Sequence, residues 1–128
     1  METNTNTKTI LLLEDDPALN RAVMLMLQKK GNRVISTLRA EDALGVLNSG
    51  HPAIAIIWLD LLLPGMNGIE FLAEVRKIPE YREIKVVICT VSGREESKAV
   101  ARELGVVDYL VKSDYDLNTL VDKVLSYT

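Results

Sequence analysis

The chain has 128 residues, of which 48% are hydrophobic and 26% charged, which fits one globular domain with a buried core. The net charge of −3 disfavours a nucleic-acid-binding surface, which requires a basic patch. No apolar run approaches the roughly 18–20 residues of a membrane span, and the single cysteine cannot form an internal disulfide. We therefore expect a cytoplasmic protein without membrane or nucleic-acid contacts.

The first structural unit follows a polar stretch. Residues 1–8 are expected to form a flexible leader, and residues 9–128 a single domain. An apolar strand is predicted over Thr9–Leu13, and a helix begins soon after it, with Asp16 as its N-cap and Pro17 in its first turn. The apolar residues of this helix recur at the spacing of one helical face: Leu19, Ala22, Val23 and Met26.

Further units of strand and helix follow in the same alternation. Strands are predicted over residues 33–37, 53–59, 84–89 and 106–111. Helices are predicted over residues 40–47, 69–77, 94–104 and 117–125. Asn67 and Glu70 are spaced as a capping box for the third helix, whereas the fourth helix has only a weak apolar stripe, formed by Ala99, Val100 and Leu104. The alternation predicts an α/β fold, a doubly wound parallel sheet with helices on both faces.

Polar residues stand where the predicted strands end. Glu14 and Asp15 follow the first strand, Asp60 the third, Thr90 the fourth and Lys112 the fifth. The carboxyl ends of parallel strands share one edge of the sheet, and ligands bind there. Carboxylates packed together repel, and a hard divalent ion such as Mg²⁺ relieves that repulsion. A bound ion would also attract a phosphoryl group, which an aspartate can accept as an acyl phosphate.

These residues together resemble the receiver domain of two-component response regulators, over nearly the whole chain after the leader. The matching features are an acidic pair, an Asp followed by an apolar-Pro step and a later Gly, a hydroxyl, a lysine, and an aromatic residue in the fifth strand. They are Glu14-Asp15, the loop from Asp60 to Gly68, Thr90, Lys112 and Tyr109. The resemblance implies a CheY-like, flavodoxin-like fold, with five parallel strands in the order 2-1-3-4-5 and five helices.

The resemblance also implies a role for each acidic residue. Asp60 would be the phosphoacceptor. Asp15 and Asp60 would bind Mg²⁺ or Mn²⁺ directly, and Glu14 would bind it through water. The backbone carbonyl of Leu62 would supply a further ligand.

Three further residues would stabilise the phosphoryl group and carry the switch: Thr90, Lys112 and Tyr109. The phosphoryl donor would be a sensor histidine kinase or a phosphotransfer protein. The surface of the fourth helix, fifth strand and fifth helix would then change for a downstream protein or an output domain outside this chain. Such a domain catalyses its own phosphorylation and dephosphorylation but is not an enzyme with a turnover substrate. A homodimer is compatible with this fold, although no residue in the sequence argues for it.

The chain departs from the family pattern near the strand ends. Ser113 follows Lys112 where the family usually has proline, so the Lys112–Ser113 bond is either a costly cis bond or a trans bond that brings the lysine in differently. Val91 follows Thr90 where the family prefers a smaller residue. Leu62 and Ser92 occupy positions that tune dephosphorylation, so the lifetime of the phosphorylated state does not transfer from the family.

Other functions of similar folds fit the sequence less well. A phosphatase of the haloacid-dehalogenase type needs a second Asp two residues after its nucleophile, where this chain has Leu62. A flavodoxin-like flavin carrier needs a phosphate-binding loop after the first strand, where the acidic run from Glu14 to Asp16 would repel phosphate. The alternative that stays open is a pseudo-receiver, a protein-binding module of the same fold that acts without phosphorylation.

Three residues with distinctive chemistry are assigned structural roles. His51, the only histidine, has no Cys or His neighbours, so no zinc site is expected. Cys89 lies within an apolar strand and is predicted to be a buried, unreactive thiol. Trp58 is predicted to lie in the core on the same side of its strand as Asp60.

Overall fold

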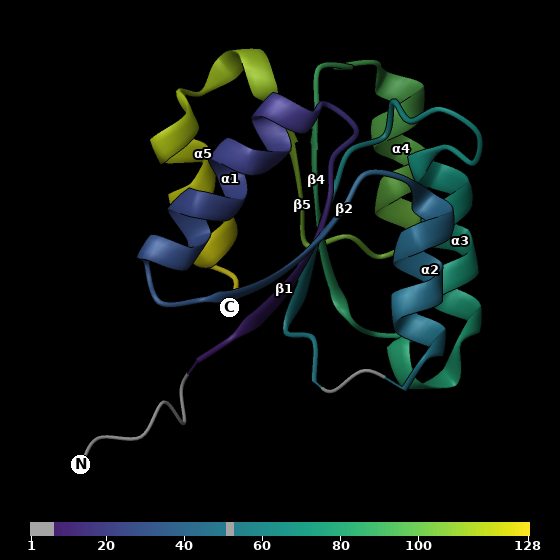
Figure 1. Cartoon of the computed structure of the whole chain (residues 1–128). Coiled ribbons are helices and arrows are strands. Elements are labelled where there is room, and N and C mark those ends of the chain that lie inside the picture. Colours follow the sequence, from purple (N-terminus) through teal and green to yellow (C-terminus); the bar gives the residue numbers. More distant parts are fainter. Residues whose placement is uncertain (1–6, 51–52) are drawn as a thin grey trace.

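The computed structural model describes residues 7–50 and 53–128, so most of the predicted leader, and His51, lie outside the described residues. Within these ranges, five parallel strands form one sheet in the order β2-β1-β3-β4-β5, with helices on both faces (Figure 1). The strands are β1 (Thr9–Leu13), β2 (Arg33–Thr37), β3 (Ile56–Leu59), β4 (Lys85–Thr90) and β5 (Asp108–Val111). The helices are α1 (Pro17–Lys29), α2 (Ala40–Asn48), α3 (Gly68–Lys77), α4 (Glu95–Glu103) and α5 (Leu117–Leu125), with the short 3-10 turns η1 (Pro79–Tyr81) and η2 (Lys112–Asp114). The predicted fold class and strand order are confirmed.

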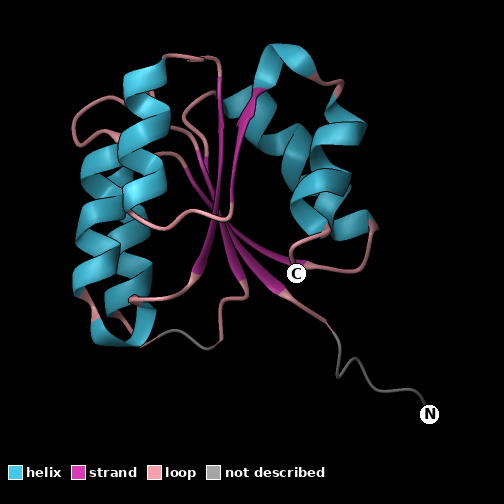
Figure 2. Cartoon of the chain, turned by 180° about the vertical axis from the view of Figure 1, so that it is seen from behind, coloured by secondary structure: helices cyan, strands magenta, loops and turns pink. Residues whose placement is uncertain are grey.

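The three central strands supply two separate layers of core, because successive side chains of a strand point to opposite faces of the sheet. One face, beneath α2, α3 and α4, carries Leu11, Leu13, Ile57, Leu59, Val86 and Ile88. The other face, beneath α1 and α5, carries Ile10, Leu12, Ile56, Trp58, Val87 and Cys89. The sheet therefore lies between two helical layers (Figure 2), which explains why these strands are apolar without alternation. The predicted burial of Trp58 and Cys89 is confirmed.

Side-chain caps begin three of the helices just after the loops at the carboxyl edge of the sheet. Asp16 accepts hydrogen bonds from backbone N–H groups in the first turn of α1, as predicted. Asn67 and Glu70 form the predicted capping box of α3, each accepting from the backbone N–H of the other. Asp116 caps α5 in the same way as Asp16 caps α1. These caps fix where each loop ends and therefore limit how far the polar residues in the loops can move.

The strand β4 is shifted by one residue from the prediction, and two strands begin more than one residue later than predicted, at Ile56 and Asp108. The residues before them make single backbone bonds to the neighbouring strand: Ala55 N–H donates to the Thr9 carbonyl, and Val107 N–H donates to the Val86 carbonyl. An isolated bond of this kind leads into a strand but does not yet make a ladder. Apolar composition alone does not distinguish these lead-in residues from the strand itself.

The buried faces of two helices differ from the predicted ones. In α1, the buried residues are Asn20, Val23 and Leu27, so the inward face contains an amide that an apolar pattern overlooks. In α4, the predicted stripe is only partly right: Leu104 packs against the core, but Ala101 is the buried residue and Val100 is 41% exposed. None of the helices in the described ranges has the length and apolar character needed to cross a membrane.

Candidate functional site

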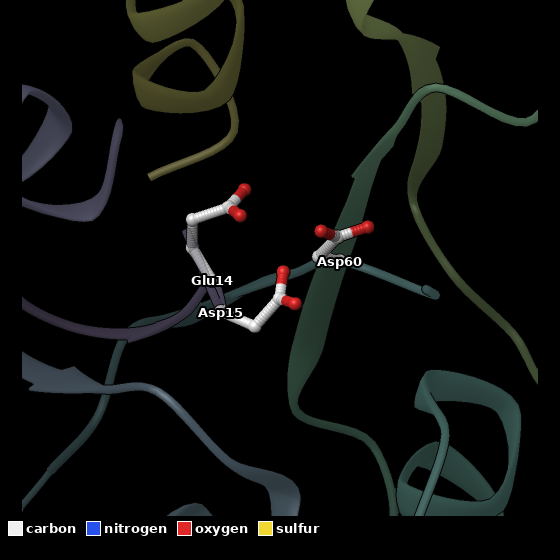
Figure 3. Close-up of side chains that lie close together, drawn as sticks. All are labelled: Glu14, Asp15 and Asp60. Carbon is white, nitrogen blue, oxygen red and sulfur yellow. The ribbon is translucent and has the colours of Figure 1, made fainter. Parts of the chain in front are cut away.

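Three carboxylates meet at the carboxyl edge of the sheet. Glu14 and Asp15 come directly after β1, and Asp60 comes directly after β3, the neighbour of β1. One oxygen of each residue lies within 4.8 Å of the others (Figure 3). The register pairs Leu13 with Leu59, so both strands end side by side. Parallel pairing therefore brings together acidic residues that are far apart in the sequence.

The donor set of this cluster fits a divalent cation. Glu14 is 1% exposed and Asp60 is 4% exposed, and Asp15 is half-buried. Buried carboxylates so close together are unfavourable unless a cation compensates them. Hard oxygen donors of this kind are the ligands that Mg²⁺ and Mn²⁺ take in proteins. Close by, the backbone N–H of Leu62 donates to Asp60 Oδ1 at 3.1 Å and fixes the orientation of that carboxylate.

Lys112 extends into the same cluster from the end of β5. Its Nζ lies 2.5 Å from Glu14 Oε1 and 3.3 Å from Asp60 Oδ2, and its side chain is 16% exposed. The described residues contain no cis peptide bond, so the Lys112–Ser113 bond is trans. The sequence left both a cis and a trans bond open, and the lysine reaches the carboxylates with the trans bond, which costs less before a serine.

Burial and charge act in opposite directions on this group of side chains. Burial raises the pKa of Glu14 above its usual 4.5, and the hydrogen bond from Lys112 only partly offsets that effect. For Lys112, burial acts to lower the pKa, but the hydrogen bond to Glu14 and the charge of Asp60 outweigh it, so its pKa is raised above 10.5. The ammonium is therefore protonated, and it contacts two of the three acidic groups, Glu14 and Asp60.

Thr90 and Tyr109 are connected through the backbone of Ser92. Thr90 is fully buried at the end of β4, and its Oγ1 accepts a long hydrogen bond, 3.4 Å, from Ser92 N–H. The hydroxyl of Tyr109 in β5 donates to the Ser92 carbonyl at 2.6 Å. The ammonium of Lys98 in α4 lies 6.0 Å from the centre of the Tyr109 ring, within cation–π range. These two hydrogen bonds connect Thr90 to Tyr109 through one residue of the β4–α4 loop.

The loop after Asp60 is held against the start of α3. The N–H of Asp60 donates to the Leu13 carbonyl at 3.0 Å, and the N–H of Gly68 donates to the Leu61 carbonyl at 3.0 Å. A Cβ on Gly68 would stand only 2.5 Å from the Asp60 carbonyl oxygen. Glycine at the first residue of α3 is therefore what allows the helix to pack so closely on the acidic residue.

One buried side chain near the site escapes an analysis based on apolar patterns. Asn20 of α1 is 3% exposed and donates to the Glu14 carbonyl and the Thr37 carbonyl, each at 3.0 Å. The sequence feature that could have revealed it is the helical spacing: Asn20 lies three residues before Val23 and therefore on the inward, otherwise apolar face of α1. Val91, which follows Thr90 where the family prefers a smaller residue, is 61% exposed.

The sequence model of the response regulator receiver domain matches residues 10–125. The chain belongs to this family. The receiver domain is similar to the transcriptional regulatory protein AfsQ1 of Streptomyces coelicolor, with 32% identity over 104 residues, which are 81% of this chain and 44% of AfsQ1. It therefore spans less than half the length of that curated relative. Receiver domains are in general signalling modules rather than enzymes, and they interact with histidine kinases or phosphotransfer proteins and with output domains.

Two solved structures that resemble the receiver domain hold ions. One is the Mn²⁺-bound form of response regulator Rcp1, with 33% identity, a TM-score of 0.80, and coverage of 93% of this chain and 90% of that one. The other is the response regulator TrrA of Thermotoga maritima in complex with Mg²⁺ and BeF, with 26% identity, a TM-score of 0.80, and coverage of 95% and 100%. Both agree with the donor chemistry of the acidic cluster in this receiver domain.

Proposed function

We propose that this receiver domain accepts a phosphoryl group on Asp60 in a reaction that requires Mg²⁺ or Mn²⁺. The main supporting observation is that the Asp60 carboxylate meets two further carboxylates and the ammonium of Lys112 at the carboxyl edge of the sheet. Ligands of open α/β sheets bind at this edge. Carboxylates alone would repel a phosphate, so the arrangement makes chemical sense for phosphoryl transfer only with cations beside them.

The proposed metal ligands are Glu14 (through water), Asp15, Asp60 and the backbone carbonyl of Leu62. The support for this set is the proximity of the three carboxylates and the similarity to the ion-bound structures of Rcp1 and TrrA. When bound, the ion neutralises charge that develops on the phosphoryl oxygens. Leu62 N–H meanwhile holds one oxygen of Asp60, which restricts the rotation of the carboxylate.

The transfer itself needs a nucleophile and donors for the phosphoryl oxygens. An oxygen of Asp60 attacks the phosphorus of a phosphohistidine, and the phosphorus–nitrogen bond breaks. Its electron pair leaves with the imidazole nitrogen, which takes up a proton, and Asp60 becomes an acyl phosphate. Lys112 already lies 3.3 Å from Asp60 and would donate to one phosphoryl oxygen, and the Thr90 hydroxyl would bind another.

The bonds from Thr90 through Ser92 to Tyr109 support a route from the site to the surface. The contact between Ser92 N–H and Thr90 Oγ1 is long at 3.4 Å, so Thr90 would lose little if it moved to donate its hydroxyl hydrogen to a phosphoryl oxygen. Displacement of Ser92 would weaken the bond that holds the Tyr109 hydroxyl. Tyr109 would then be free to turn inward, which would change the surface formed by α4, β5 and α5.

The proposed donor is a sensor histidine kinase or a phosphotransfer protein, and the recipient of the signal is a downstream protein or an output domain. The single cysteine and this class of partner support the cytoplasm as the compartment. The proposed domain covers residues 9–128. The pseudo-receiver alternative has less support, because Asp60, Lys112 and both members of the acidic pair lie together.

Intact-mass measurement after incubation with acetyl phosphate tests the proposal. The wild-type protein should gain one phosphoryl group in Mg²⁺, and none in EDTA. Asp60→Asn should gain none under either condition, because an amide is not a nucleophile for this reaction. If the adduct hydrolyses before it is detected, beryllofluoride binding measured by calorimetry shows whether the site can hold a phosphoryl-like group.

Two results would contradict the proposal. An adduct that persists in the Asp60→Asn variant would assign the chemistry to another residue. The absence of both an adduct and beryllofluoride binding in the wild type would favour the pseudo-receiver.

A further inference from the structure

Asn20 is a polar side chain placed within the apolar layer between α1 and the sheet. It is 3% exposed and shares the inward face of α1 with Val23 and Leu27. Burial of an amide among apolar side chains is unfavourable unless its hydrogen bonds are satisfied. Its position therefore requires partners, and these partners are at the strand ends next to the acidic cluster.

The amide of Asn20 connects the ends of β1 and β2. Its Nδ2 donates to the carbonyl of Glu14 and to the carbonyl of Thr37, each at 3.0 Å. Its Oδ1 accepts from the hydroxyl of Ser36. Both amide hydrogens and the amide oxygen are thus engaged, and all three partners belong to the ends of neighbouring strands. Glu14 N–H also donates to the Thr37 carbonyl at 3.2 Å, so Asn20 continues the β1–β2 ladder beyond its last paired residues.

The bond from Asn20 acts on the backbone of an acidic residue. Fixing the carbonyl of Glu14 fixes the peptide plane between Glu14 and Asp15, because the peptide bond is planar. The orientation of that plane determines the direction in which both side chains leave the backbone. Without Asn20, the Glu14 carbonyl would lack this donor in a buried environment, and the peptide plane would be free to rotate toward other partners.

We propose that Asn20 is a positioning residue that holds the Glu14–Asp15 peptide in the orientation required for both carboxylates to bind a divalent cation. This inference rests on the proposed metal site. Partners that orient metal ligands commonly contribute about 10- to 100-fold to metal affinity. A residue that only ties α1 to the sheet would instead change the stability of the fold and leave metal affinity unaltered.

The test compares Asn20→Leu with Val23→Ala in the full chain. Leucine branches at the same atom as asparagine but donates no hydrogen bond. Val23→Ala is the matched control, because Val23 is fully buried on the same face of α1 and its apolar side chain makes no hydrogen bond to Glu14. Mn²⁺ affinity is measured by the loss of the free-ion electron paramagnetic resonance signal, and urea unfolding is measured in parallel.

We expect Asn20→Leu to raise the Kd for Mn²⁺ by about 10-fold or more, and Val23→Ala to leave it unchanged despite a loss of stability. Ser36→Ala removes only the donor to Asn20 Oδ1 and should raise the Kd by a smaller factor. Ser36 is exposed, so Ser36→Ala should fold. If Asn20→Leu does not fold, the Kd of Ser36→Ala tests the positioning role of Asn20.

Three outcomes would overturn the inference. An unchanged Kd in Asn20→Leu, or in Ser36→Ala if only that variant folds, would assign Asn20 a purely structural role. An equal rise in Asn20→Leu and Val23→Ala would mean that metal affinity follows general stability. Failure of the wild type to bind Mn²⁺ would remove the proposed metal site itself, and this result is distinguishable from the other two.

Discussion

Replacement of Gly68 by alanine should destabilise the protein even though the residue lies in a helix. The added Cβ would stand 2.5 Å from the Asp60 carbonyl oxygen and 2.6 Å from the Leu61 Cα, both of them backbone atoms that cannot rotate away. Ordinary contact begins near 3.4 Å, so the loop or the helix would have to shift by roughly 0.9 Å, the difference between 3.4 and 2.5 Å. Such overpacking costs about 1–3 kcal/mol.

The intrinsic preference of alanine for helices works in the opposite direction but is smaller. It favours alanine over glycine by up to about 1 kcal/mol in a helix interior, and Gly68 is the first residue of α3, where the gain is less. We therefore expect a net loss of about 1–2 kcal/mol in the free energy of unfolding. Because the displaced atoms belong to the loop that carries Asp60, Mg²⁺ affinity should fall as well.

Gly45→Ala is the matched control for this prediction. Gly45 lies within α2, and a Cβ there would meet no atom within 4 Å. This variant should gain about 0.5–1 kcal/mol. Urea unfolding followed by the fluorescence of Trp58, which is 1% exposed in the folded protein, measures both. If Gly68→Ala had the same free energy of unfolding as Gly45→Ala, the close approach of α3 to Asp60 would not require glycine at residue 68.

Three further predictions concern single side chains. Lys112→Met leaves the buried carboxylates of Glu14 and Asp60 without their ammonium partner. The free energy of unfolding without metal should therefore fall by about 3 kcal/mol and recover when Mg²⁺ is added. Equal stability of the variant with and without Mg²⁺ would contradict this. Burial raises the pKa of the Cys89 thiol, which should resist a disulfide reagent at neutral pH until the protein unfolds; rapid labelling of the folded protein would count against it. The hydrogen bond from the Tyr127 hydroxyl to Asp108 raises the pKa of that phenol above 10.0 in the folded protein. The hydrogen bond therefore stabilises the fold fully below pH 10.0, and this stabilisation is lost as the pH rises through the raised pKa of the folded protein. An ultraviolet titration beside Tyr127→Phe checks this, because the difference between the two curves is the titration of Tyr127, and a midpoint of that difference at or below 10.0 would refute it.

Local patterns in the sequence were enough to predict the strands, the helices and much of the acidic site. Apolar runs and helical spacing predicted all five strands and five helices within a few residues, because side-chain periodicity is a property of neighbouring residues. The Asp16 cap and the capping box of Asn67 and Glu70 are equally local. The polar residue after each strand could also be read directly, and the rule that parallel strands end at one edge was enough to predict that Glu14, Asp15 and Asp60 meet.

The tertiary structure alone decided the contacts that join distant parts of the chain. Asn20 looks like an interruption of an apolar stripe until its helix packs against the strand ends, where the amide finds the Glu14 carbonyl. The need for glycine at residue 68 depends on how closely α3 approaches Asp60. Lys112 reaches Glu14 across 98 positions of sequence, and the trans bond that carries it there is a property of the folded loop. Each of these depends on distances between residues that only packing brings together, and no local pattern encodes such distances.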